Sequence, residues 1–284
     1  MKTNVIRRKS LESKSAGQAE PEARDGGVQS VDRALSIIET LAEDDEGYRL
    51  SDLAVRTGLS TSTVHRLLAT LEKRRFVHFD RTESKWHVGA QSFAVGATFA
   101  RRRNFAAQAM PYLRKLRDQT RETANLAVVD DESIIVLARI ESREIMRSLT
   151  KVGGRVAMVA SGVGKAVLAI YPDDDVNAII CRQGMPRLTE KSVVRPGELF
   201  RELETIRRRG YAVDDEEARM GLRCVAAVVY NDCSEPLAAI SVSGRTSRIT
   251  DERLPVLGCI VRAVATELTL VLGGVMPPIA EAVG

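Results

Sequence analysis

A run of seven residues in the first third of the chain carries the side chains that DNA recognition needs. The segment Ser60–Arg66 reads Ser-Thr-Ser-Thr-Val-His-Arg, so short hydroxyl side chains precede a histidine and an arginine. Short hydroxyls allow a backbone to approach base edges, and an arginine bonds guanine through two parallel hydrogen bonds or holds a phosphate. The residue types and their order therefore predict contact with DNA.

The residues after Ser60 predict the helix that presents these side chains. Apolar residues recur at helical spacing from Val64 to Leu71, and serine is a typical residue at a helix N-cap. On such a helix Ser62 and Arg66 lie opposite the apolar stripe. The stripe would seat the helix on its neighbours and leave its polar face to solvent.

The surrounding elements predict a winged helix-turn-helix. Two helices are expected before this one, Ser30–Leu41 and Ser51–Thr57, each capped by its first serine and the second ended by Gly58. Two short alternating segments, Phe76–Phe79 and Lys85–Val88, follow it and predict a β-hairpin. The predicted elements have the order of that motif, namely a helix, a short helix, a glycine turn, a polar helix and a hairpin.

The predicted DNA contacts share a polar or basic side chain on the first helix, on the polar helix or at the hairpin. They are Arg33, Ser60, Thr61, Ser62, Thr63, His65, Arg66, Arg81 and Lys85. A generic three-helix bundle with a solvated basic face is the plainer interpretation of the same residues. All three histidines lie in this region, but no cysteine or acid stands at metal-ligand spacing beside them, so no zinc site is expected.

Composition narrows the class of protein. The 284 residues are 44% hydrophobic and 28% charged, which is ordinary for a soluble protein of two domains. A formal net charge of +4 permits a nucleic-acid partner without requiring one. No apolar run approaches the length of a membrane span, and the basic N-terminus has no secretory apolar region. The four cysteines are scattered, which favours a reduced, cytoplasmic setting. No cofactor is expected.

Polarity and periodicity divide the chain into five parts. We expect a disordered tail at residues 1–27 and a DNA-binding domain at 28–90. A linker helix at 91–103 leads to an effector-binding and oligomerisation domain at 104–275, and a second tail follows at 276–284. The first tail is either a plain solvated extension or a weak accessory DNA contact through its basic residues at 7–9.

The second half alternates predicted strands and helices. The strands are expected at 124–129, 133–140, 211–213, 224–230 and 236–243, and the helices at 162–170, 174–181, 197–209 and 250–271. Short turns join neighbouring strands, which favours an α+β domain built on a largely antiparallel sheet flanked by helices.

The ordered part of the chain resembles the IclR (isocitrate lyase regulator) family of transcription regulators. The resemblance rests on six blocks, Ser30–Leu35, Ser60–Leu68, Ala160–Ala166, Gly210–Glu217, Gly221–Cys224 and Ala239–Gly244. It implies a winged helix-turn-helix joined by a linker helix to a GAF-like effector domain. It also implies a homodimer or a dimer of dimers that binds double-stranded operator DNA.

The C-terminal residues themselves indicate a pocket for a small acid. The small residues Ser161–Gly164 precede an apolar helix and would leave backbone N–H groups open to a carboxylate. Ser241 and Ser243 share one face of their strand. The resemblance to glyoxylate- and pyruvate-responsive members implies a site made of Gly162, Val163, Asp214, Leu222, Cys224, Ser241 and Ser243.

The resemblance also indicates which acid is bound. The segment Gly210–Thr250 is most similar to the acetate-operon, or glyoxylate-bypass, type of regulator, so glyoxylate is the expected effector. The resemblance implies that the stretch Ile145–Val156 forms a wall of the pocket. Pyruvate or an aromatic or sugar acid remains the alternative, because Ser148 in this stretch stands where that type of regulator carries a bulky apolar residue.

An enzyme and a purely oligomerising second domain are the alternatives to a regulator that senses an acid. Gly164-Lys165 does not complete a P-loop, because Val159 replaces the first glycine and Ala166 replaces the serine or threonine. The second domain has no histidine to act as a general base, so an enzyme that uses Asp214 and Cys224 is the distant alternative. The third possibility is a second domain that only oligomerises.

Overall fold

The computed structural model describes residues 28–102, 105–130, 133–142 and 151–277, which fall into two compact units divided between Ser92 and Phe93. Each unit has its own core. Helix α4, Ala90–Arg102, begins in the first unit and continues into the second. The predicted N-terminal tail, Ser148 and most of the predicted C-terminal tail lie outside the described residues.

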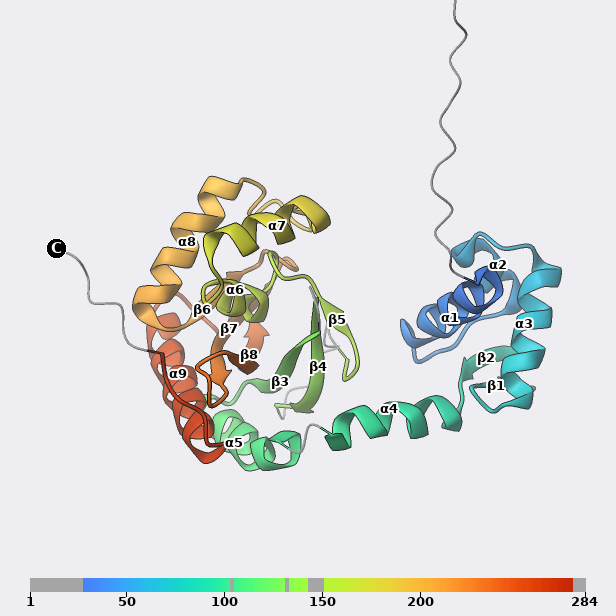
Figure 1. Cartoon of the computed structure of the whole chain (residues 1–284), viewed down its shortest axis with the longest axis horizontal. Coiled ribbons are helices and arrows are strands. Elements are labelled where there is room, and N and C mark those ends of the chain that lie inside the picture. The colour runs from blue at the N-terminus through green and yellow to red at the C-terminus, as the bar shows by residue number, and fades with distance from the viewer. Residues whose placement is uncertain (1–27, 103–104, 131–132, 143–150, 278–284) are drawn as a thin grey trace, which may run out of the picture. The chain divides into compact units, whose positions relative to one another are not determined.

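The first unit has the predicted order of elements (Figure 1). Helices α1 (Gln29–Ala42), α2 (Leu50–Thr57) and α3 (Thr61–Lys73) precede strands β1 (Val77–Asp80) and β2 (Lys85–Val88). The two strands pair antiparallel. Their shared core contains Ile37, Leu41, Leu53, Val64, Leu68, Val77 and Trp86. A winged helix-turn-helix is therefore confirmed.

Two of the three predicted serine caps are wrong. Helix α1 starts at Gln29 with Val28 as its N-cap residue, and α2 starts at Leu50 with Arg49 as its N-cap residue, and neither cap makes a side-chain hydrogen bond. Ser60 does cap α3, because its hydroxyl accepts a hydrogen bond from the Thr63 N–H at 3.3 Å. Gly58 ends α2 with φ of 67°, the left-handed conformation that glycine adopts without strain.

The second unit is an antiparallel sheet between two layers of helices. The sheet order is β5-β4-β3-β8-β7-β6. These strands span Arg155–Val156, Ser133–Ile140, Thr123–Asp130, Pro236–Arg245, Leu222–Tyr230 and Ala212–Asp215. The two-residue strand β5 was not expected from the sequence, because it is too short to show alternation.

Helices cover both faces of this sheet (Figure 1). One face packs against α5 (Phe105–Thr120) and α9 (Arg253–Val271), and the other packs against α6 (Gly162–Leu168), α7 (Asp173–Gln183) and α8 (Pro196–Arg209). Alternation along β7 divides the two cores, since Val225 faces α9 and Ala226 faces α6. The predicted α+β fold with an antiparallel sheet is therefore confirmed.

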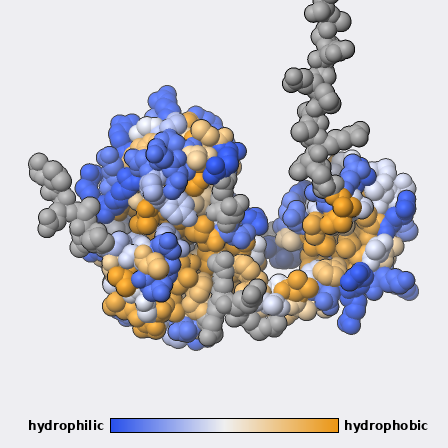
Figure 2. Space-filling model, viewed as in Figure 1, coloured by the Kyte–Doolittle hydropathy of each residue, from blue (hydrophilic) through white to orange (hydrophobic). Residues whose placement is uncertain are grey.

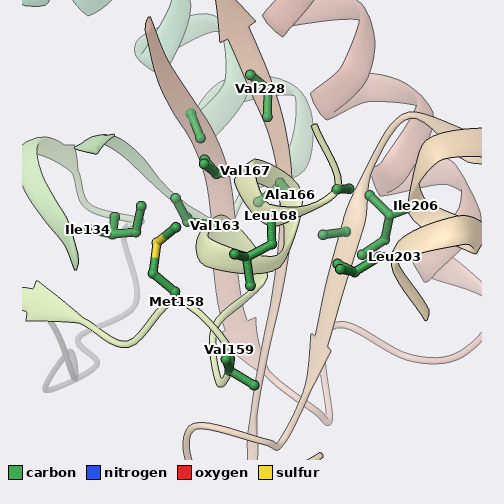
Figure 3. Close-up of a cluster of buried hydrophobic side chains, with 14 of the residues drawn as sticks. Ile134, Met158, Val159, Val163, Ala166, Val167, Leu168, Leu203, Ile206 and Val228 are labelled. Carbon is green, nitrogen blue, oxygen red and sulfur yellow. The ribbon is translucent and has the colours of Figure 1, made fainter. Parts of the chain in front are cut away.

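Helix α6 lies in the centre of its layer. Figure 3 shows its apolar side chains, Val163, Val167 and Leu168 among them, surrounded by residues of the sheet and of α8. All seven residues of α6 are buried. Gly164 has no room for a side chain, because a Cβ atom there would lie 2.1 Å from the Met158 carbonyl oxygen. The start of α6 therefore packs closely against the backbone of the segment that follows β5.

Helix α9 is as long and apolar as a membrane span, although no such run was expected from the sequence. In the described ranges it is the helix that is long and apolar enough to cross a membrane by length and composition. One of its faces is buried in the core beside α5 and β7, and Lys115 of α5 forms an ion pair with its Glu267 at 2.5 Å. A helix in the core of a folded domain passes the same test of composition.

Candidate DNA-binding surface and ligand pocket

Helix α3 presents the polar face that its sequence predicts. Thr61, Ser62, His65 and Arg66 are exposed, whereas Val64 is fully buried against the other helices. The side chains of these four residues are open to a partner along one side of the helix. Ser60 and Thr63 are linked by their hydroxyls at 2.8 Å, so these two hydroxyls organise the helix start.

The wing presents fewer free side chains than the sequence predicts. Arg81 is exposed in the turn between β1 and β2, and Asp80 fixes that turn by accepting hydrogen bonds from the N–H groups of Thr82 and Glu83. These two bonds lower the pKa of Asp80 below its usual value. Lys85 is half-buried and donates to the Glu46 carbonyl oxygen at 2.9 Å, so its ammonium is already engaged.

Arg33 lies outside both of these elements. It lies on α1 and is half-buried.

The second unit contains a pocket of about 230 Å³ between the sheet and the start of α6. All seven residues of the expected effector site line it, namely Gly162, Val163, Asp214, Leu222, Cys224, Ser241 and Ser243. The pocket also contains residues that were not expected from the sequence. These are Asn125, Ala127, Val136, Ala157, Ala160, Leu188 and Ala218. Ser161, Arg155 and Val156 also line it, the first as part of the predicted start of the helix and the other two as part of the wall that the family resemblance implied.

The strand register brings the polar groups of the pocket onto one face of the sheet, in two adjacent rows. Cys224 on β7 is paired with Ser243 on β8 and with Asp214 on β6. Asn125 on β3 is paired with Ser241, two residues along the same face of β8. Paired residues on neighbouring strands point to the same side of a sheet, so four strands contribute to one polar floor.

The start of α6 lies against this polar floor. A Cβ atom on Gly162 would lie 3.4 Å from the Cys224 sulfur and 3.5 Å from the Asp214 Cβ. The Ser161 hydroxyl caps the helix by accepting from the Gly164 N–H at 3.0 Å. Glycine at position 162 therefore leaves space in the pocket that any larger residue would fill.

Asp214 is a buried acid. Its Oδ1 atom accepts hydrogen bonds from the N–H groups of Glu217 at 2.8 Å and Ala218 at 3.3 Å. Burial raises the pKa of Asp214 to about 6, although these bonds and the nearby Lys165 charge favour the ionised form. Its Oδ2 atom accepts no hydrogen bond from the described part of the chain. Burial, followed by the charge of Asp214, also raises the pKa of the Cys224 thiol to about 12, so the thiol stays protonated.

Most of the unexpected pocket residues carry weak sequence signals. Asn125 lies in a predicted strand and shares a face with buried residues, so a polar residue there was detectable as an exception to the pattern. Arg155 and Val156 were expected in the pocket wall from the family resemblance, but the strand β5 that they form is too short to show a pattern in the sequence. Leu188 belongs to the loop between α7 and α8, and loop residues reach a pocket only through the fold.

A winged helix-turn-helix and a separate unit with a small polar pocket define the class of ligand-responsive transcription regulators. Residues 30–81 match the IclR helix-turn-helix domain, and residues 97–270 match the bacterial transcriptional regulator IclR C-terminal domain. The chain therefore belongs to the IclR family.

Curated relatives and solved structures agree with this assignment. The chain is 42% identical to the acetate operon repressor of Salmonella typhimurium over 88% of this chain and 92% of that protein. It is 34% identical to the transcriptional repressor AllR of Escherichia coli, over 90% and 94%. The structure of a Rhodococcus putative transcriptional regulator covers 87% of this chain and 99% of its own, with 27% identity and a TM-score of 0.70. These relatives are regulators and not enzymes, as expected.

Proposed function

We propose that this chain represses transcription from an operator and that a short 2-oxo acid, glyoxylate first, controls it. The observation that carries the proposal is the pocket, since one small cavity is lined by all seven residues expected to bind the acid. The likeness to the acetate operon repressor supports repression. Because its partner is chromosomal DNA, we propose that the protein acts in the cytoplasm.

Pocket size and lining favour a short acid over an aromatic or sugar acid. A volume of about 230 Å³ is below the range of about 300–1,000 Å³ that is usual for drug-sized ligands. Asp214 and the two serines supply polar atoms, and Leu222 and Val163 supply apolar wall. A 2-oxo acid of two to four carbons has a carboxylate and a carbonyl oxygen on neighbouring carbons, which suits this mixture. Pyruvate is the second candidate.

On the DNA side, we propose that α3 enters the major groove. The exposed Ser62, Thr61 and Arg66 would contact base edges or phosphates, and Arg81 of the wing would follow the backbone. Lys85 is a weaker candidate because its ammonium already donates to Glu46, and Arg33 is a weaker candidate because it lies half-buried on α1 and not on α3 or the wing. Effector and DNA are coupled only if the acid binds two conformations with different affinity. The proposed transmitter is α4, which runs between the two units in the sequence.

We propose that the active form is a homodimer or a dimer of dimers, in which the linker helix 91–103 and the C-terminal part, residues 104–275, contribute to assembly. Figure 2 shows apolar side chains gathered over α1, where Val28, Val31 and Leu35 are 53–66% exposed. Phe93 on α4 is 77% exposed. A second copy of the chain is the partner that a two-fold operator requires.

Calorimetry tests the proposal. Glyoxylate, pyruvate and longer acids are titrated into the protein, with and without DNA from upstream of the gene. Gly162→Val fills the pocket and should abolish acid binding while DNA affinity stays within about twofold. Gly197→Val, at an open position in the first turn of α8, is the matched control and should keep both. No acid binding by the natural protein would reject the sensor function. No salt-dependent affinity for the DNA would reject the regulator function.

A further inference from the structure

Asn125 is tied to both serines of the pocket floor. Its side-chain Nδ2 donates to the Ser241 hydroxyl at 3.4 Å and to the Ser243 hydroxyl at 3.3 Å. The three residues come from two neighbouring strands, β3 and β8, and all three line the pocket. One amide group therefore uses both of its protons on two hydroxyls that face the same cavity.

These two bonds decide what the serines offer to a ligand. A hydroxyl has one proton to donate and two lone pairs to accept with. Because each serine already accepts from Asn125, its own proton is free to point elsewhere. Ser241 also interacts with the Cys224 thiol, whose sulfur is a weak acceptor. A carboxylate oxygen in the pocket is a better acceptor for both protons.

The charges around the pocket make such donors necessary. Arg155 is the cation among its described lining residues, and its side chain is 63% exposed and bonded to Asp130 at 3.0 Å. Lys165 lies behind the pocket, where Glu202 and Glu217 already pair with it. An anion in the pocket must therefore be held mainly by neutral donors, and the fixed hydroxyls of Ser241 and Ser243 are such donors.

We propose that Asn125 is a positioning residue that makes Ser241 and Ser243 a pair of hydrogen-bond donors, and that this pair selects a carboxylate over its uncharged amide. The proposal rests on the acid-sensing function given above and adds to it the origin of charge selectivity. In this role Asn125 acts through the two serines and does not itself contact the ligand.

Asn125→Asp reverses this arrangement and is the main test. An ionised aspartate only accepts, so both serines must donate to it and turn lone pairs toward the pocket. We expect pyruvate binding to weaken by about 10- to 100-fold, because charge-assisted hydrogen bonds are lost. Pyruvamide, its uncharged analogue, should bind the variant at least as well as it binds the natural protein. The preference between the two probes should therefore invert. Because the new charge also repels an anion directly, the uncharged variant Asn125→Ala is needed beside it.

Two further variants complete the test. Asn177→Asp introduces the same charge at an exposed position on α7 and should leave both affinities unchanged. Asn125→Ala removes the donor without adding charge, and it should weaken pyruvate by about three- to tenfold while retaining the fold. If thermal unfolding shows that Asn125→Asp does not fold, the pyruvate affinity of Asn125→Ala alone tests the role of Asn125.

The outcomes separate the inference from the function on which it rests. If the natural protein binds acids and Asn125→Asp or a folded Asn125→Ala binds pyruvate with unchanged affinity and preference, the role of Asn125 is wrong while the sensor function stands. If the natural protein binds neither pyruvate nor glyoxylate, the acid-sensing function fails and the inference fails with it.

Discussion

Lys165 and Glu202 form an ion pair in the interior of the second unit, with the lysine Nζ 2.6 Å from the glutamate Oε1. The Lys165 side chain is fully buried, and Glu217 pairs with it from another side. The second carboxylate oxygen of Glu217, Oε2, is buried and has no hydrogen-bond partner in the described chain. Burial raises the pKa of Glu217 to about 7, although Lys165 favours its ionised form. The lysine beside Gly164 thus serves packing and charge balance behind the pocket.

Lys165→Met should destabilise the second unit by about 3–5 kcal/mol, because it leaves Glu217 buried without its cation. Lys191→Met is the matched control, since Lys191 is exposed and pairs with Asp215 and Glu216 at the surface. That change should have little effect on stability, because exposed ion pairs contribute little. Urea unfolding of both variants measures the difference. Equal losses would show that the buried pair is not a special element of stability.

Stability should depend on pH through Asp214 and Glu217. Both pKa values are raised in the folded state, to about 6 and about 7, so the folded chain holds more protons than the unfolded chain at mildly acidic pH. The stabilisation is present below the unfolded pKa values near 4 and is lost as pH rises through 6 and 7. Asp214→Asn should reduce this loss by about 1–3 kcal/mol in denaturant unfolding between pH 5 and pH 8. If the free energy of unfolding of Asp214→Asn depends on pH as strongly as that of the natural protein, the raised pKa of Asp214 is wrong.

Acid binding should follow the same titration. An anion beside ionised Asp214 is repelled, whereas protonated Asp214 is neutral and can donate a hydrogen bond. Calorimetry with pyruvate should therefore give tighter binding at pH 5.5 than at pH 8, with a limit of about tenfold per pH unit for one proton taken up. In Asp214→Asn the pH dependence should flatten. Binding that is equally tight at both pH values would show that the anion lies away from Asp214.

Gly164→Ala should strain the start of α6, because the added Cβ would lie 2.1 Å from the Met158 carbonyl oxygen. Overpacking of this kind costs about 1–3 kcal/mol or more. Gly197→Ala is the control, since that position in α8 has open space around it. It should be neutral or stabilising by about 0.5–1 kcal/mol. Thermal unfolding of both variants compares them, and a neutral Gly164→Ala would mean that the Met158 backbone moves easily.

Arg66→Ala should weaken operator binding. If Arg66 holds a phosphate, the slope of log affinity against log salt should fall by about one. If it bonds guanine, about 1–3 kcal/mol of discrimination at one base pair should be lost. Fluorescence anisotropy with operator and mutated duplexes at several salt concentrations separates the two outcomes. Arg195→Ala is the control, at the N-cap of α8, where the side chain is 78% exposed. No change for Arg66→Ala would remove it from the interface.

Local patterns in the chain were sufficient to predict the winged helix-turn-helix and most strands of the second unit. Ser60 could be assigned as a cap because its bonds lie within four residues, and alternation from Pro236 onward identified β8. The wrong caps at Ser30 and Ser51 have the same origin, since a suitable residue type is necessary for a cap but does not fix where a helix starts.

By itself, the sequence determined the period of each helix and strand, the polar face of α3 and, through family resemblance, the seven residues that line the pocket. Only the tertiary structure decided that Asn125 is bonded to Ser241 and Ser243 across 116 and 118 residues of chain. It also decided that Lys165 is buried and that Asp214 holds its proton to higher pH. Strand register and the exclusion of water are collective results of packing, so no local pattern of residues encodes them.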